Sequence, residues 1–165
     1  MKTTPHQIGV SALLLRLALG VIFVGHGAFK FLVLGLPATA QFFADHGFPA
    51  WTASPVAVAE VLGGLMLVFG WRARWASVAL VPVALGAVLV HGPNGWYFGA
   101  PHGGWEYPAF LSVALVAQAF LGDGLFALSS LLRGRAPSRA RGQNPADDLG
   151  GLVTRKATGR ATAHD

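Results

Sequence analysis

The sequence contains no cysteine among its 165 residues. This absence excludes a disulfide bond, a thiolate nucleophile and an ordinary cysteine-ligated iron–sulfur cluster. If the protein takes part in redox chemistry, a bound ligand or a partner must therefore carry the electrons.

Charged residues are also scarce, at 12% of the chain against about 25% in soluble domains. The stretch from Trp75 to Trp105 contains no Asp, Glu, Lys or Arg, whereas the helices of a soluble bundle need polar faces that repeat with the helical period. Together with a hydrophobic content of 53% and a mean hydropathy of +0.53, this pattern favours a membrane protein. The net charge of +5 does not indicate a nucleic-acid partner, because so apolar a chain cannot spread that charge over a water-facing surface.

Four apolar stretches predict the architecture, since a helix that crosses a hydrocarbon core of ~30 Å needs about 20 residues. They cover residues 8–34, 55–71, 75–91 and 107–121. Ser54 and Pro55 favour a helix start with a serine N-cap, and Pro82 predicts a kink within the third stretch. We therefore expect an all-α integral membrane four-helix bundle within a transmembrane domain of residues 1–132.

Three other features complete this organisation. Residues 37–54 mix apolar and polar side chains and predict a short interfacial or re-entrant segment on the outer side, and residues 125–132 predict an interfacial helix. Residues 133–165 are basic and poor in large apolar side chains, which predicts a disordered tail that either sets topology or lies on anionic lipid. Small residues within the spans predict close helix packing; these are Gly20, Gly25, Gly27, Gly63, Gly64 and Gly86.

Basic residues predict the orientation of the chain. If the N-terminus is cytoplasmic and there are four spans, ten of the twelve Lys and Arg residues lie on one side, namely Lys2, Arg72, Arg74 and the seven in the tail. The positive-inside rule makes that side the cytoplasm. We therefore expect both termini on the cytoplasmic face, with Arg72 and Arg74 setting the topology.

Polar side chains from all four spans are expected to meet in the outer half of the bundle. They are His26, Lys30, Glu60, His91, Asn94, Glu106 and Tyr107. Ionisable groups at membrane depth are costly and commonly mark functional sites. The functional interpretation is a ligand pocket open to the outer side, in which the glutamates accept hydrogen bonds and the basic groups donate them.

A purely structural interpretation of the same residues stays open. Glu60 could pair with His26 or Lys30 to hold two helices together, while His91 and Asn94 cap a loop. A carboxylate is an unusual packing device in lipid, where Ser, Thr or Gly normally serves, and this favours the functional interpretation.

Arg16 is expected to be structural, because it lies near the cytoplasmic end of the first span, too far along the helix axis to reach Glu60 easily. It could snorkel or pair with helix-end carbonyls, and Asp123 is one partner available at that end.

Metal and haem cofactors find little support in the sequence. Haem between spans would need two facing imidazoles, for which His26 and His91 are the membrane-embedded pair. Zinc would need a set such as His91, His102 and Glu106, which matches no specific ligand spacing. We therefore expect neither haem nor zinc.

The residues in this order resemble the DoxX family of small bacterial membrane proteins over about residues 10–130. The matching segments are Arg16-Leu17-Ala18-Leu19-Gly20, His26-Gly27 with Lys30, Ala59-Glu60-x-Leu62-Gly63-Gly64, Gly70-x-x-x-Arg74, His91-x-x-Asn94-Gly95 and Glu106-Tyr107-Pro108. The resemblance implies a four-span bundle in the bacterial cytoplasmic membrane and an association with membrane redox systems. Members of the family are described as a subunit of a quinone-linked thiosulfate oxidoreductase, or as the membrane member of an oxidative-stress complex. The resemblance transfers no catalytic residue.

Three functions follow as hypotheses. The leading one is an accessory subunit of a membrane oxidoreductase, rather than a self-contained enzyme, in which a quinone or lipid meets Glu60, His26 and His91. The second is a transporter of protons or a small solute, for which the inner half offers only Arg16. The third is a membrane scaffold that recruits redox-complex subunits or further copies of this chain.

Overall fold

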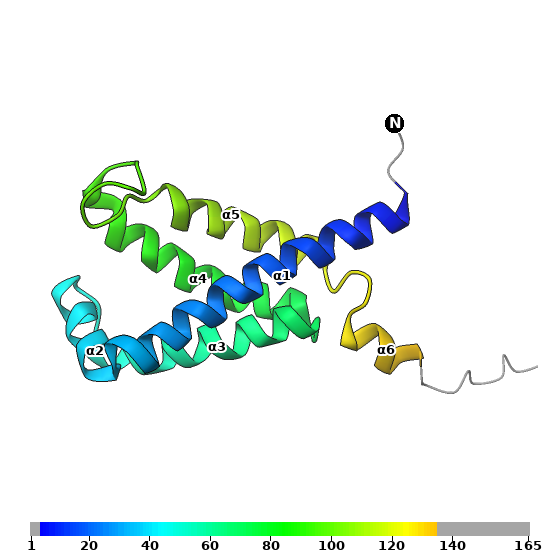
Figure 1. Ribbon diagram of the computed structural model, residues 1–165, viewed down its shortest axis with the longest axis horizontal. Helices are drawn as coiled ribbons and strands as arrows, with labels where there is room; N and C mark the ends of the chain where they lie inside the picture. Colours follow the sequence, from blue (N-terminus) through cyan, green and yellow to red (C-terminus); the bar gives the residue numbers. More distant parts are fainter. Residues whose placement is uncertain (1–3, 135–165) are drawn as a thin grey trace, which may run out of the picture. The chain divides into compact units, whose positions relative to one another are not determined.

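The computed structural model describes residues 4–134 of the chain. Within this range every regular element is a helix (Figure 1), which confirms the all-α prediction. The elements, in chain order, are α1 (Pro5–Phe29), η1 (Lys30–Leu34), α2 (Leu36–Asp45), η2 (Ala50–Thr52), α3 (Ala53–Phe69), α4 (Ala73–His91), η3 (Gly92–Asn94), α5 (Glu106–Leu121) and α6 (Leu128–Gly134). The predicted tail lies outside the described residues, except that its first two residues end α6.

Within residues 4–134, three helical segments are long and apolar enough to cross a membrane, namely Pro5–Leu34, Ala50–Phe69 and Ala73–Asn94. Their exposed faces carry large apolar side chains, such as Leu32 at 83% exposure, as expected of a surface solvated by lipid. Helix α5 has 16 residues and rises about 24 Å, less than the ~30 Å hydrocarbon core. A fourth crossing therefore stays a prediction.

The helix ends differ from the expected ones by up to three residues. Helix α1 begins at Pro5 because Thr4 and Gln7 form a capping box. The predicted serine N-cap of the second span is wrong: α3 begins at Ala53, so Ser54 lies inside the helix. Thr52 holds the N-cap position, but its hydroxyl donates to the Pro49 carbonyl at 2.6 Å instead of capping the helix.

Helices α1 and α3 pack closely through glycine. A Cβ atom added to Gly20 would lie 2.8 Å from the Gly64 carbonyl oxygen, and one added to Gly64 would lie 2.8 Å from the Gly20 carbonyl oxygen. A Cβ atom added to Gly27 would lie 2.9 Å from the Ala57 carbonyl oxygen, and one added to Gly63 would lie 3.0 Å from the Leu80 side chain, whereas Gly25 and Gly86 would meet nothing within 4 Å. The close-packing prediction is therefore confirmed for four of the six glycines and wrong for Gly25 and Gly86.

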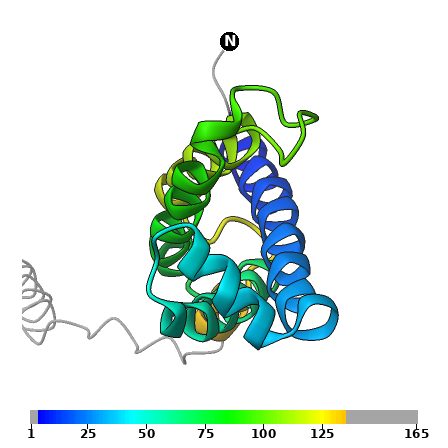
Figure 2. The ribbon, with the colours of Figure 1, turned by 90° about the vertical axis from the view of Figure 1, so that its left-hand side faces the viewer.

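Contacts between the long helices form a closed ring. Helix α1 packs on α3, α3 on α4, α4 on α5, and α5 on α1. The apolar core between them includes Leu19, Phe23, Leu67, Leu80 and Leu115. Figure 2 looks along the helices from the end that carries α2, which lies across this end between α1 and α4. The remaining space at this end forms the candidate site.

Candidate functional site

A cavity of about 320 Å³ lies among α1, α3, α4 and α5 at the end that carries α2. Its wall is largely apolar and includes Ile22, Phe23, Val56, Val83, Ala87 and Leu111. Six polar or ionisable residues also line it: His26, Lys30, Thr52, Glu60, His91 and Tyr107. Five of these are among the seven ligand-binding residues predicted from the sequence.

A buried ion pair joins η1 to α3 inside the cavity. The Lys30 ammonium donates to both carboxylate oxygens of Glu60, with Nζ to Oε1 at 2.9 Å and Nζ to Oε2 at 2.7 Å. The two side chains are 16% and 6% exposed. Of the two partners that the sequence left open for Glu60, the structure therefore gives the direct contact to Lys30. Lys30 is the first residue of η1, a π-helical turn, and such turns are frequent at functional sites.

The two cavity histidines are held by backbone carbonyls. His26 Nδ1 lies 2.8 Å from the Ile22 carbonyl oxygen one turn earlier. His91 Nδ1 lies 3.1 Å from the carbonyl oxygen of His102 and 3.3 Å from that of Gly103. The His26 ring also stacks near Tyr107, with centroids 6.4 Å apart. Both imidazoles therefore have a set orientation.

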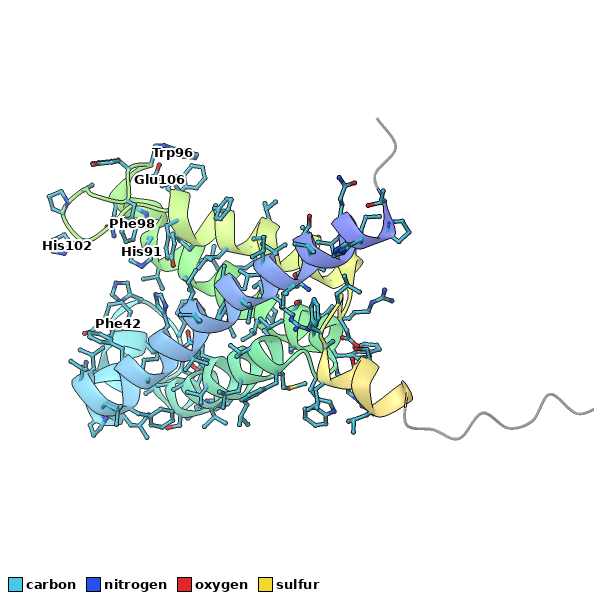
Figure 3. All side chains as sticks on the ribbon, turned by 45° about the vertical axis from the view of Figure 1, so that its right-hand side comes forward. Phe42, His91, Trp96, Phe98, His102 and Glu106 are labelled. Carbon is cyan, nitrogen blue, oxygen red and sulfur yellow. The ribbon has the colours of Figure 1, made fainter. Side chains whose placement is uncertain are left out.

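Two predicted pocket residues do not line the cavity. Asn94 donates to the His102 carbonyl at 3.1 Å, and one carboxylate oxygen of Glu106 accepts from the Phe98 backbone amide at 2.9 Å. Both side chains thus hold the loop between α4 and α5, in which Figure 3 labels Trp96, Phe98 and His102. For Glu106 the expected hydrogen bond in the pocket is replaced by one to the loop backbone.

Aromatic residues of the predicted interfacial segment line the cavity, and the sequence reasoning missed them. Phe42 and Phe43 come from α2, and Phe48 follows it. Figure 3 shows Phe42 at the same end of the bundle as His91 and Phe98. Three phenylalanines within seven residues were a visible signal, but the sequence could not show which surface they cover.

Arg16 lies outside the cavity, at the opposite end of the bundle. Its side chain is 2% exposed and donates to the carbonyl oxygens of Asp123 at 2.7 Å and Phe126 at 3.0 Å. The Asp123 carboxylate in turn accepts from the Ala73 backbone amide at 2.7 Å. Arg16 therefore ties α1 to the loop before α6, and its carbonyl partners lie in this loop rather than at a helix end.

Arg72 and Arg74 flank the start of α4 and are both exposed. Arg72 adopts a left-handed backbone conformation with φ of 50° in the turn that follows α3. Their place between two apolar helices is compatible with a role in topology, which stays a prediction.

No group of three or more His, Asp or Glu residues gathers closely enough to hold a metal ion within residues 4–134. His91 and His102 meet through a ring nitrogen and a backbone carbonyl rather than through two rings. The set of His91, His102 and Glu106 considered for zinc is therefore not assembled in the described part of the chain.

Comparison with known proteins gives a family match that spans about half of the chain. The DoxX family model matches residues 11–92. A protein of Bacillus subtilis (strain 168) named "Putative oxidoreductase CatD" is 36% identical over 80 residues, which are 48% of this chain and 58% of that protein. The match thus spans less than two thirds of the relative's length. No solved structure matches the chain.

Proposed function

Because residues 11–92 belong to the DoxX family, we propose that this membrane protein is an accessory subunit of a membrane oxidoreductase or oxidative-stress assembly. In this role it binds a hydrophobic carrier of the quinone type in the cavity among α1, α3, α4 and α5. The observation that carries the proposal is an apolar cavity with a few polar groups, lined in part by helices long and apolar enough to cross a membrane, which suits a ligand with an apolar body and a polar ring.

The chemistry of the chain supports a binding role rather than a self-contained reaction. Without cysteine, the chain offers no thiolate and no ordinary cysteine ligands for an iron–sulfur cluster, so electrons would travel on the bound carrier and on partner subunits. The name of the Bacillus subtilis relative includes the word oxidoreductase, which agrees with this assignment for that protein.

The proposed carrier would lie with its ring near the Lys30–Glu60 ion pair. Glu60 and Lys30 face the cavity from one side of the bundle, on α3 and η1, and His91 and Tyr107 come from α4 and α5. The phenylalanines of α2 would then cover the ring at the end of the bundle.

Filling the cavity tests the proposal directly. Ala87 lines the cavity, and Ala79 is exposed on the same helix and does not line it. We expect the short-chain quinone ubiquinone-1 to bind saturably to the purified protein in nanodiscs, as measured by isothermal titration calorimetry. Ala87→Leu should weaken that binding at least tenfold, and the matched control Ala79→Leu should leave it unchanged. Absence of saturable binding, or equal binding by both variants, would refute the proposed site.

The proposal includes residence in a bacterial cytoplasmic membrane with both termini in the cytoplasm. The natural lack of cysteine allows a clean labelling test with single-cysteine variants. We expect a membrane-impermeant maleimide to label Pro101→Cys in intact spheroplasts but to label Trp71→Cys and Ser138→Cys only after lysis. Labelling of Ser138→Cys in intact spheroplasts would contradict the fourth crossing.

A further inference from the structure

The hydrogen bonds of the two cavity histidines determine which ring nitrogen carries a proton. A backbone carbonyl oxygen can only accept a hydrogen bond, so Nδ1 of His26, beside the Ile22 carbonyl, must be the protonated nitrogen. The same holds for Nδ1 of His91, beside the carbonyls of His102 and Gly103. In a neutral imidazole only one nitrogen is a donor. In its neutral form each ring therefore keeps an Nε2 lone pair that accepts hydrogen bonds.

The other polar groups of the cavity are also biased toward accepting. The Thr52 hydroxyl uses its proton on the Pro49 carbonyl, which leaves only lone pairs on that oxygen. The Glu60 carboxylate is an acceptor throughout. The donors opposing them are few: Lys30 directs two of its three ammonium protons to the oxygens of Glu60, which leaves one, and the Tyr107 hydroxyl can donate or accept as its neighbour requires.

Because acceptors outnumber donors on this wall, a ligand that brings hydrogen-bond donors fits it better than one that only accepts. A quinone ring carries two carbonyl oxygens, which only accept, whereas the reduced quinol carries two hydroxyl groups, which donate. A quinone carbonyl placed against an Nε2 lone pair would lose its hydration and gain no hydrogen bond, and an unpaired buried polar group is costly. A quinol hydroxyl at the same place gains one.

Resting on the proposed function, we propose that the cavity selects the reduced, hydroxyl-bearing form of an aromatic carrier over its oxidised form. His26 and His91 are the residues that determine this specificity, because each presents one Nε2 acceptor to a ligand hydroxyl. The protein would accordingly bind the quinol either after a reductive reaction has produced it or before an oxidative reaction consumes it.

Three ligands of nearly equal shape test the selectivity. They are ubiquinol-1, its dimethyl ether and ubiquinone-1, of which only the quinol has hydroxyl donors. We would titrate each anaerobically into the full-length protein in nanodiscs at pH 8. We expect ubiquinol-1 to bind about 25-fold more tightly than either of the others, because each of the two hydrogen bonds contributes about fivefold.

Histidine variants identify the acceptors. We expect His26→Leu, and separately His91→Leu, to weaken the binding of ubiquinol-1 about fivefold and to change that of ubiquinone-1 less than twofold. His46 is a matched control for His26, because its Nδ1 bonds to the Phe42 carbonyl one turn earlier, as Nδ1 of His26 bonds to the Ile22 carbonyl. The His46 side chain does not line the cavity. His46→Leu should leave the affinities for all three ligands unchanged.

The outcomes separate this inference from the proposed function. If ubiquinone-1 or the dimethyl ether binds as tightly as ubiquinol-1, or if the His26 and His91 variants weaken all three ligands equally, the selectivity is refuted while a carrier site stands. If none of the three ligands binds saturably, the proposed function fails and the selectivity fails with it. The comparison of ligands on the unaltered protein decides the matter even if a variant does not fold.

Discussion

The Lys30–Glu60 pair allows a quantitative prediction about stability. Lys30→Met keeps most of the apolar stem but removes the ammonium from both oxygens of a carboxylate that is 6% exposed. Removing one partner of a buried ion pair costs about 3–5 kcal/mol, because the remaining charge is left without compensation. Since the lysine side chain is 16% exposed, water can reach the vacated position, and we expect a cost of about 3 kcal/mol, at the low end of that range.

The double-mutant cycle makes the prediction sharper. Glu60→Gln should cost about 2 kcal/mol, because the freed Lys30 ammonium is better placed to reach water than the buried carboxylate. The double variant Lys30→Met/Glu60→Gln has no uncompensated charge and should also cost about 2 kcal/mol, well below the sum of the single changes. The interaction free energy between the two residues is then about 3 kcal/mol, within the range for groups in direct contact.

The free energy of unfolding would be measured by SDS titration in mixed micelles, followed by the helical circular dichroism signal. Asp45→Asn is the matched control, because Asp45 accepts a side-chain hydrogen bond from Gln41 at 2.8 Å on an exposed surface, and exposed polar pairs contribute only about 0.5 kcal/mol. Additive costs in the Lys30–Glu60 cycle, or a Lys30→Met cost no larger than that of Asp45→Asn, would refute the view of a buried, mutually dependent pair.

Three further predictions concern the packing and the protonation of the bundle. Arg16→Met should lower the free energy of unfolding by about 3 kcal/mol, because it removes two charge-assisted hydrogen bonds to loop carbonyls, and Arg16→Lys should recover part of this loss; an unchanged unfolding midpoint for Arg16→Met would contradict the role. Gly64→Ala should destabilise the protein by about 1–3 kcal/mol, because the new methyl group meets the backbone of α1. Gly25→Ala has open space around it and should be neutral or stabilising by up to about 1 kcal/mol. Equal shifts of the melting temperature in the two variants would count against the close packing. Solid-state ¹⁵N NMR of histidine-labelled protein at pH 8 should show Nδ1–H tautomers for His26 and His91, and Nε2–H signals from these two rings would exclude the hydrogen bonds described.

Hydropathy and the spacing of apolar residues were sufficient to predict an all-helical fold with helices long enough to cross a membrane. An apolar stretch long enough to cross a membrane must satisfy its backbone hydrogen bonds internally. It is therefore predicted to form a helix, regardless of the elements that pack against it. For Arg16 the sequence left snorkelling and pairing with helix-end carbonyls open, and the structure gives it two carbonyls of the loop before α6. The helix ends were less predictable: the Thr52 hydroxyl could have capped α3 but bonds to Pro49.

The tertiary structure decided which of the candidate polar groups share one cavity. His26 and Lys30 are four residues apart in the sequence and lie on one helix face. Only the packing of α1 on α3, through Gly20 and Gly64, determines which of them contacts Glu60 directly. Glu106 has the residue type and the approximate depth of a pocket group, yet it bonds to the loop backbone.

The phenylalanines that line the cavity show the same limit. A sequence states which side chains are apolar, but it does not state against which surface a ten-residue helix such as α2 comes to lie. That choice depends on non-local contacts among helices far apart in the chain. The sequence by itself therefore determined a helical membrane protein with scarce, concentrated polar groups, and only the tertiary structure decided that five of those groups line one apolar cavity.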